Sequence, residues 1–306
     1  MSSPHDKAWS DFWAQNTKSG QDGGCLPAKY QGIDAAQRAA WHGFAKDLPR
    51  KSALLDVATG DGRVMRWILQ KRSDVKPVGV DMAPELPAPP KGARVRSGVP
   101  MEELPFPDAK FDAVTSQFGF EYGDLEAAAS EIARVLKPEG IVGLITHRID
   151  GPILAHNAAR REQIGWAIDE QTLIEVAKGN LKLRASGLQT VSTKIMNAPA
   201  IGAQQFGRGS AAWEIAEAVK QTLSLGARDH PANVARLLDT IRDRAQNEIG
   251  RINSLEAACK QTADADGFES AVLAGGLTQV SAEPMVDNVS NQPFADFRVL
   301  RKTTGN

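Results

Sequence analysis

The chain has 306 residues, with 36 Lys and Arg against 37 Asp and Glu, so its formal net charge is −1. This balance gives no electrostatic footprint for nucleic acid or an anionic membrane. Cys25 and Cys259 are too few for a disulfide framework or a thiolate zinc site. No signal peptide and no apolar run of about eighteen residues are found. We therefore expect a soluble, cytoplasmic protein without a metal, a membrane segment or a nucleic-acid partner.

The first 50 residues are expected to form helices ahead of a central strand. Trp9, Phe12 and Trp13 share one face at helical spacing. Asp34 followed by Gln37 is typical of a second helix start.

A glycine-containing loop organises the next segment. An apolar run leads to Asp56, the small residues 58–62 (ATGDG) follow, and residues 63–72 place apolar side chains at helical spacing. This order predicts a buried strand, a tight turn and a helix, which is the first βα unit of a nucleotide-type α/β domain. Glycine suits the turn because it tolerates positive φ and lets the backbone approach a ligand.

The charges of this loop limit its ligand. Asp56 and Asp61 would repel a dinucleotide diphosphate, and Met65 stands where the third glycine of G-x-G-x-x-G would be. A ligand that is adenosine-like at one end and cationic at the other fits better, as S-adenosylmethionine is. Here the sequence resembles the class I S-adenosylmethionine-dependent methyltransferases, whose first motif is (V/L)LDxGxGxG, with Ala58 in place of a glycine. The resemblance implies a cofactor site at Asp56, Ala58, Thr59, Gly60, Asp61 and Gly62.

A second strand is predicted at residues 77–81. It ends at Asp81, 21 residues beyond Gly60, and an acid at this spacing accepts hydrogen bonds from ribose hydroxyls in nucleotide folds. We therefore assign Asp81 and the adjacent Met82 to the cofactor. Four prolines in residues 82–92 predict an extended loop instead of the usual helix.

The next segment resembles the "GDAExLPFPDxxFD" sequence of the group that includes the ubiquinone and menaquinone biosynthesis methyltransferases. It follows a predicted third strand at residues 93–98. The resemblance implies an aspartate contact to the adenine, but Pro100 occupies that position here. A backbone contact near Met101 remains, and Glu102 aligns with the glutamate of the family.

A fourth strand is predicted at residues 111–119, and the resemblance places substrate and methionine-end contacts at its carboxyl end. Gln117 and Phe118 are the candidates there. A helix at residues 125–136 and a fifth strand at 141–146 follow, and EIARVLKPEG between them closely matches "ExxRVLKPGG".

The remaining sequence completes a predicted α/β fold. Residues 151–276 read as a helical insert between strands 5 and 6, with helices at 153–178, 211–225 and 231–263. Residues 277–286 and 294–301 alternate as a closing antiparallel hairpin. We thus predict a Rossmann-like seven-stranded sheet with an antiparallel C-terminal hairpin.

Three domains follow from this reading: an N-terminal helical lid at 1–50, an S-adenosylmethionine-binding domain at 51–150 and 277–306, and the insert at 151–276. The lid is implied by the resemblance, and a helix that packs on the sheet is an equal alternative. The insert is either a substrate cap or the surface of a homodimer.

The predicted activity is methyl transfer to an O or N atom of a small-molecule acceptor. The cofactor supplies the hard chemistry, and a poorly acidic hydroxyl also needs a base. His147 is the first candidate because imidazole titrates near neutrality. Glu121 and His156 are weaker candidates, and Tyr122 orients the substrate in this interpretation. A carboxylate or neutral amine acceptor would need no base.

Two other functions stay open. A methyltransferase-like protein that binds S-adenosylmethionine or a partner without catalysis is the main alternative, and Pro100 supports it. A nicotinamide-dependent oxidoreductase is disfavoured by Asp56, Asp61 and the missing glycine, and no Y-x-x-x-K motif occurs near Tyr30 or Tyr122.

Overall fold

The computed structural model describes residues 31–186 and 191–303. The helix predicted around Trp9 and most of the predicted lid at 1–50 lie outside these residues. Contacts within the chain define two compact units, residues 1–154 with 254–306, and residues 155–253.

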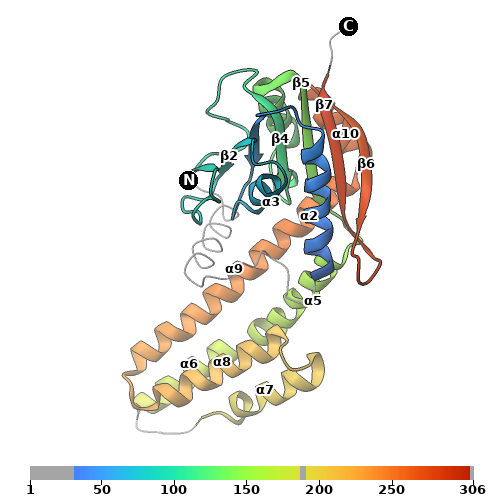
Figure 1. The fold of residues 1–306 in the computed structure, drawn as a ribbon. Helices are drawn as coiled ribbons and strands as arrows, with labels where there is room; N and C mark the ends of the chain where they lie inside the picture. The colour runs from blue at the N-terminus through green and yellow to red at the C-terminus, as the bar shows by residue number, and fades with distance from the viewer. Residues whose placement is uncertain (1–30, 187–190, 304–306) are drawn as a thin grey trace. The chain divides into compact units, whose positions relative to one another are not determined.

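The first unit contains one mixed sheet (Figure 1), with strand order β3-β2-β1-β4-β5-β7-β6 among the described residues. The strands are β1 (Ala53–Val57), β2 (Lys76–Asp81), β3 (Arg94–Ser97), β4 (Phe111–Gln117), β5 (Leu136–His147), β6 (Leu277–Val286) and β7 (Pro293–Lys302). The parallel pairs are β3 with β2, β2 with β1, β1 with β4, and β4 with β5. Strand β7 pairs antiparallel with both β5 and β6. The predicted Rossmann-like sheet with its antiparallel hairpin is confirmed.

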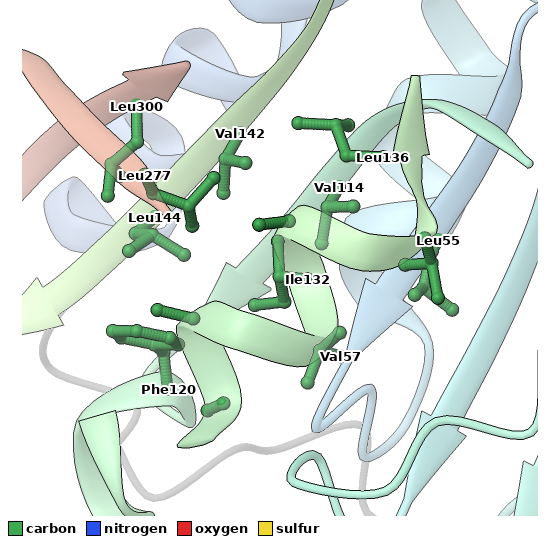
Figure 2. Packing of buried hydrophobic residues seen from close by; sticks show 14 of the residues in the cluster. Leu55, Val57, Val114, Phe120, Ile132, Leu136, Val142, Leu144, Leu277 and Leu300 are labelled. Atoms are coloured by element: carbon green, nitrogen blue, oxygen red, sulfur yellow. The ribbon is translucent and has the colours of Figure 1, made fainter. Parts of the chain in front are cut away.

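Helices cover both faces of this sheet, because neighbouring residues of a strand point to opposite sides. Leu54 packs in a cluster with Trp41 and Ile68, whereas the adjacent Leu55 packs in another cluster with Ile132. Figure 2 shows this second cluster between the sheet and α4. The helical elements that lie wholly in this unit are α2 (Gln31–Lys46), α3 (Arg63–Lys71), η1 (Phe120–Tyr122), α4 (Leu125–Val135) and α10 (Ala265–Ala274).

The second unit is helical and has its own apolar core, which includes Trp166, Ile174, Val219 and Leu238. The unit boundaries fall inside α5 (Pro152–Gly165) and α9 (Pro231–Ala263). Between these helices lie η2 (Trp166–Glu170), α6 (Leu173–Ala185), α7 (Thr193–Phe206), α8 (Ala211–Leu225) and η3 (Gly226–Arg228).

The helix predictions for this region are partly confirmed. The helices predicted at 211–225 and 231–263 coincide with α8 and α9. The single helix predicted at 153–178 is wrong. A π-helical turn follows Gly165, and Thr172 adopts a left-handed conformation with φ of 48°, so α6 starts as a separate helix.

Candidate functional site

The loop after β1 has the backbone conformation that its glycines predict. Gly60 and Gly62 have φ of 50° and 70°, in the left-handed region where an L-residue is strained. A Cβ at Gly62 would lie 2.9 Å from Cδ of Pro90, so the proline-containing loop after β2 packs against this turn. Ala58 shares the left-handed conformation, with φ of 54°.

The Asp56 carboxylate faces the protein interior. Its side chain is buried, and its two oxygens accept hydrogen bonds from Oγ1 of Thr59 at 2.6 Å and Oγ1 of Thr115 at 2.7 Å. Burial raises the pKa of Asp56 to about 7. Asp56 therefore fastens the loop to β4 in this structure.

The Asp61 carboxylate is paired within the protein. Oδ2 lies 2.7 Å from NH2 of Arg63, and Nε of the same guanidinium also donates to the carboxylate. The argument that Asp56 and Asp61 together favour a cationic ligand therefore needs correction. The sequence displays both acids but not the hydroxyls and the guanidinium that surround them. The cofactor assignment depends instead on the glycine turn, Asp81 and the family motifs.

Asp81 joins the loops that follow β1 and β2. Its Oδ2 accepts a hydrogen bond from the backbone N of Gly60 at 2.9 Å, and Oδ1 accepts one from the N of Ala83 at 2.9 Å. Each oxygen has further acceptor capacity, so ribose hydroxyls can still bind. Burial raises the pKa of this carboxyl. Met82 follows it and is exposed.

The segment with Met101 and Glu102 lies beside the same strand end. The backbone N of Val99 donates to the carbonyl of Asp81 at 2.9 Å. Oε1 of Glu102 accepts a hydrogen bond from the N of Asp124 at 3.1 Å, and Asp124 is the N-cap of α4. Glu102 thus has a structural partner, and its assignment to the cofactor stays a prediction.

Gln117, at the end of β4, is tied to α2. Its Oε1 accepts a hydrogen bond from Nε1 of Trp41 at 2.7 Å, and its Nε2 donates to Oε1 of Gln37 at 3.3 Å. Nε2 of Gln37 is buried and has no acceptor among the described residues. Sequence reasoning used Gln37 only as a helix-start signal, because its pairing with a residue 80 positions away is not visible in a pattern.

The loop after β4 lies against the glycine turn. A Cβ added to Gly119 would overlap Cβ of Ala58, so the two loops meet without space for a side chain at Gly119. The preceding Phe118 has φ of 55°, and its ring stacks on the His147 imidazole with centroids 4.0 Å apart. Phe118 therefore connects His147 to the glycine turn, because its ring stacks on the imidazole and the next residue, Gly119, contacts Ala58.

The three predicted catalytic residues lie together. Nδ1 of His147 lies 2.8 Å from Oε1 of Glu121, and the backbone N of His147 donates to the same oxygen at 3.0 Å. The Tyr122 ring meets the imidazole edge-on at 5.8 Å. His156, a weaker candidate for the base, belongs to the second unit.

The sequence did not indicate two residues that contact the segment of His147. Oγ1 of Thr262 donates to the carbonyl of His147 at 2.7 Å. Arg298 donates to Oγ1 of Thr146 at 3.1 Å and to the carbonyl of Thr262 at 3.2 Å, and its guanidinium lies 4.4 Å from the centroid of the Phe268 ring. These residues come from α9 and β7 and belong to no motif, so no sequence signal identifies them.

Residues 31–186 and 191–303 contain no group of three His, Cys, Asp or Glu side chains that is arranged to hold a metal ion. No described helix combines the length and the apolar character that crossing a membrane requires.

Comparisons with known proteins agree with the motifs. Residues 55–144 match the family model described as a methyltransferase domain. A demethylmenaquinone methyltransferase of Thermus thermophilus is 36% identical over 111 residues, which are 33% of this chain and 50% of that protein. A ubiquinone/menaquinone biosynthesis C-methyltransferase of Geobacter sulfurreducens is 40% identical over 98 residues, or 28% of this chain and 38% of that protein.

The family match begins in β1 and ends in β5, so it leaves out β6 and β7. The chain spans half or less of the length of these curated relatives. The solved 1,6-didemethyltoxoflavin-N1-methyltransferase of Burkholderia thailandensis aligns with 99% of this chain and 92% of its own, at 12% identity and a TM-score of 0.46. That likeness is too low to carry an argument. The matched segment and its motifs show that residues 55–144 form a methyltransferase domain of the class I S-adenosylmethionine-dependent family.

Proposed function

We propose that this chain transfers a methyl group from S-adenosylmethionine to an O or N atom of a small-molecule acceptor. The observation that carries the proposal is the contact between Gly119 and Ala58. This contact joins the turn that would hold the cofactor to the loop whose Phe118 ring stacks on the His147 imidazole. In this proposal an adenosyl site and a proton acceptor would lie at one edge of the sheet, where open α/β folds bind their ligands.

The residues at this edge suit the cofactor. The turn at Gly60 and Gly62 leaves no side chain in the way of a nucleoside, and Asp81 offers carboxylate oxygens to ribose hydroxyls. When bound, the cofactor supplies an electrophilic methyl group on a sulfonium.

The protein's own contribution is to orient the acceptor and remove a proton. The Phe118 and Tyr122 rings flank the imidazole of His147 and would limit the poses of a flat acceptor. Alignment of the reacting atoms near van der Waals contact accounts for much of the rate enhancement in such a displacement. His147 would accept the proton of the attacking O–H or N–H group.

A carbon acceptor is the second candidate. The names of the matched relatives describe a demethylmenaquinone methyltransferase and a ubiquinone/menaquinone biosynthesis C-methyltransferase. Transfer to an activated ring carbon also releases one proton, which His147 would accept. The connectivity of the methylated product, read by carbon NMR, separates transfer to carbon from transfer to oxygen or nitrogen.

The partners follow from the same reading. A near-zero net charge favours a small organic substrate over nucleic acid. Homodimerisation through the amphipathic helices of residues 151–276 and a cytoplasmic location remain part of the proposal. Light scattering of the purified chain measures whether it forms a homodimer.

The experiment begins with calorimetric titration of S-adenosylmethionine, with NADH as the control ligand. A methyl-donor consumption assay against a small-molecule library follows. Binding of S-adenosylmethionine together with turnover on an acceptor supports the proposal. Tight binding without turnover on any acceptor supports the non-catalytic alternative, and binding of NADH alone supports an oxidoreductase.

A further inference from the structure

Glu121 is placed where it can orient His147 but not touch an acceptor. Its side chain is 0% exposed. One oxygen, Oε1, accepts hydrogen bonds from both the backbone N and Nδ1 of His147. The other oxygen, Oε2, is also buried and has no partner among the described residues. A carboxylate enclosed in this way cannot take a proton directly from a bound molecule.

The remaining contacts of His147 hold it from other directions. Its carbonyl accepts the hydrogen bond of Thr262, and its ring face lies on Phe118. Within the described residues, Nε2 makes no hydrogen bond, yet it is not among the buried polar atoms that lack a partner. The side chain keeps 7% exposure. Nε2 is therefore the polar atom of His147 that reaches a surface and remains available.

A guanidinium and a buried thiol lie near Glu121. The guanidinium of Arg298 interacts electrostatically with Glu121. The nearby Cys259 is buried, and desolvation raises the pKa of its thiol to about 12, so the thiol adds no charge near neutral pH. The other charged groups of this cluster interact with Cys259 or Arg298, and they are Glu256, Glu269, Asp296 and Arg148.

We propose that Glu121 is a positioning residue that keeps the imidazole proton on Nδ1, so that Nε2 is the bare nitrogen that receives the proton of the acceptor. This inference rests on the proposed function and narrows its substrate class to acceptors with a neutral O–H or N–H group. As the acceptor proton passes to Nε2, the acceptor atom bonds to the methyl carbon. The carbon–sulfur bond breaks, and S-adenosylhomocysteine leaves with that electron pair.

The tautomer can be measured without any acceptor. The chain has five histidines, so long-range ¹H–¹⁵N correlation spectra of histidine-labelled protein resolve each ring, and His147→Gln identifies the signals of His147. We expect the Nδ1–H form in the wild type, and an increased share of the Nε2–H form in Glu121→Gln. An Nε2–H ring in the wild type would overturn the proposal, and this spectrum suffices even if the variant does not fold.

A kinetic comparison separates positioning from stability. With an acceptor found by the library assay, Glu121→Gln should lower kcat about a hundredfold, with unchanged KM for S-adenosylmethionine. The matched control is Glu248→Gln, which removes the carboxylate paired at 2.7 Å with Arg160 in the second unit, and it should keep the wild-type kcat. A wild-type kcat in Glu121→Gln would overturn the proposal. Failure to bind S-adenosylmethionine would refute the proposed function and leave the tautomer result standing.

Discussion

The glycine turn and the His147 cluster occupy the same edge of the sheet but are built in different ways. The turn, at residues 58–62, is a continuous segment whose backbone conformation follows from its own residues. The cluster takes Glu121 from η1, His147 from β5 and Thr262 from α9. A site formed by one continuous segment can therefore be predicted from the sequence, whereas a site assembled from separate elements depends on tertiary packing. Single substitutions in either region test this difference.

The largest expected effect concerns the assembled site. His147→Gln removes the proton acceptor and should lower kcat by about 10²–10⁴-fold on an acceptor with an O–H group. The affinity for S-adenosylmethionine, measured by calorimetry, should not change, because the turn and Asp81 remain intact. A variant with wild-type kcat would show that the cluster is structural and that the comparison between two functional regions fails.

The second prediction concerns Asp56, which lies behind the turn. Its folded pKa is raised to about 7 from 3.8, so between these values the folded state binds the extra proton. The carboxyl therefore costs stability progressively as pH rises from about 4 to about 7, on the order of 4 kcal/mol in total. Asp56→Asn should remove this loss. Urea denaturation at pH 5 and pH 8 measures how the free energy of unfolding changes with pH in the wild type and in Asp56→Asn.

The control for this slope is Asp112, whose pKa is shifted the other way. It accepts hydrogen bonds from Lys137 and from the backbone N of Ala53, and its pKa is lowered overall although burial opposes the shift. Its stabilisation is complete above about pH 4 and is lost only below it. Asp112→Asn should lower stability equally at pH 5 and pH 8. An unchanged slope in Asp56→Asn would show that Asp56 is ionised in the folded protein.

The sequence predicted most of the sheet because strands such as β1 and β4 are short and largely buried. Strand β5 begins at Leu136, before the predicted start at residue 141. The order of βα units and the terminal alternation were sufficient for the topology, including the antiparallel β7. The region of residues 153–178 was not predictable in detail, because the break at Thr172 depends on a left-handed conformation that no glycine or proline announces. Tertiary packing decides such a break.

The functional site shows the same difference between residues that a motif predicts and residues that only packing brings together. Asp81 lies at the expected strand end, and it accepts a hydrogen bond from the backbone N of Gly60, 21 residues earlier. The charge argument for Asp56 and Asp61 was incomplete, because a sequence shows charges and not their partners. Thr262 and Arg298 had no motif at all, since their contacts to the His147 segment span more than 100 positions.

The third prediction tests the local site. Asp81→Ala removes two hydrogen bonds to backbone amides as well as the proposed ribose contacts. Hydrogen bonds to charged groups contribute about 1.5–3 kcal/mol each, so the loss of one ribose contact alone should lower the affinity for S-adenosylmethionine by about ten- to a hundredfold. Titration calorimetry measures it.

Asp74 offers a matched control for Asp81. It also accepts a backbone hydrogen bond, from Lys51, and pairs with Arg72, but it precedes β2 instead of ending it. Asp74→Ala should lower stability without changing the affinity. Equal affinities in Asp81→Ala and the wild type would remove Asp81 from the cofactor site.

The smallest effect is expected at Ala58, where the sequence departs from the family motif. An L-residue in the left-handed conformation costs about 1–2 kcal/mol, and glycine avoids this cost but is more flexible when unfolded. Ala58→Gly should therefore raise the free energy of unfolding by about 0.5–1 kcal/mol, measured by urea denaturation. The same exchange at Ala39, an exposed position inside α2, should lower it by about 1 kcal/mol. If both variants lose stability, the methyl group of Ala58 contributes more by packing on Gly119 than its backbone strain costs, and the turn is then not determined by its local sequence alone.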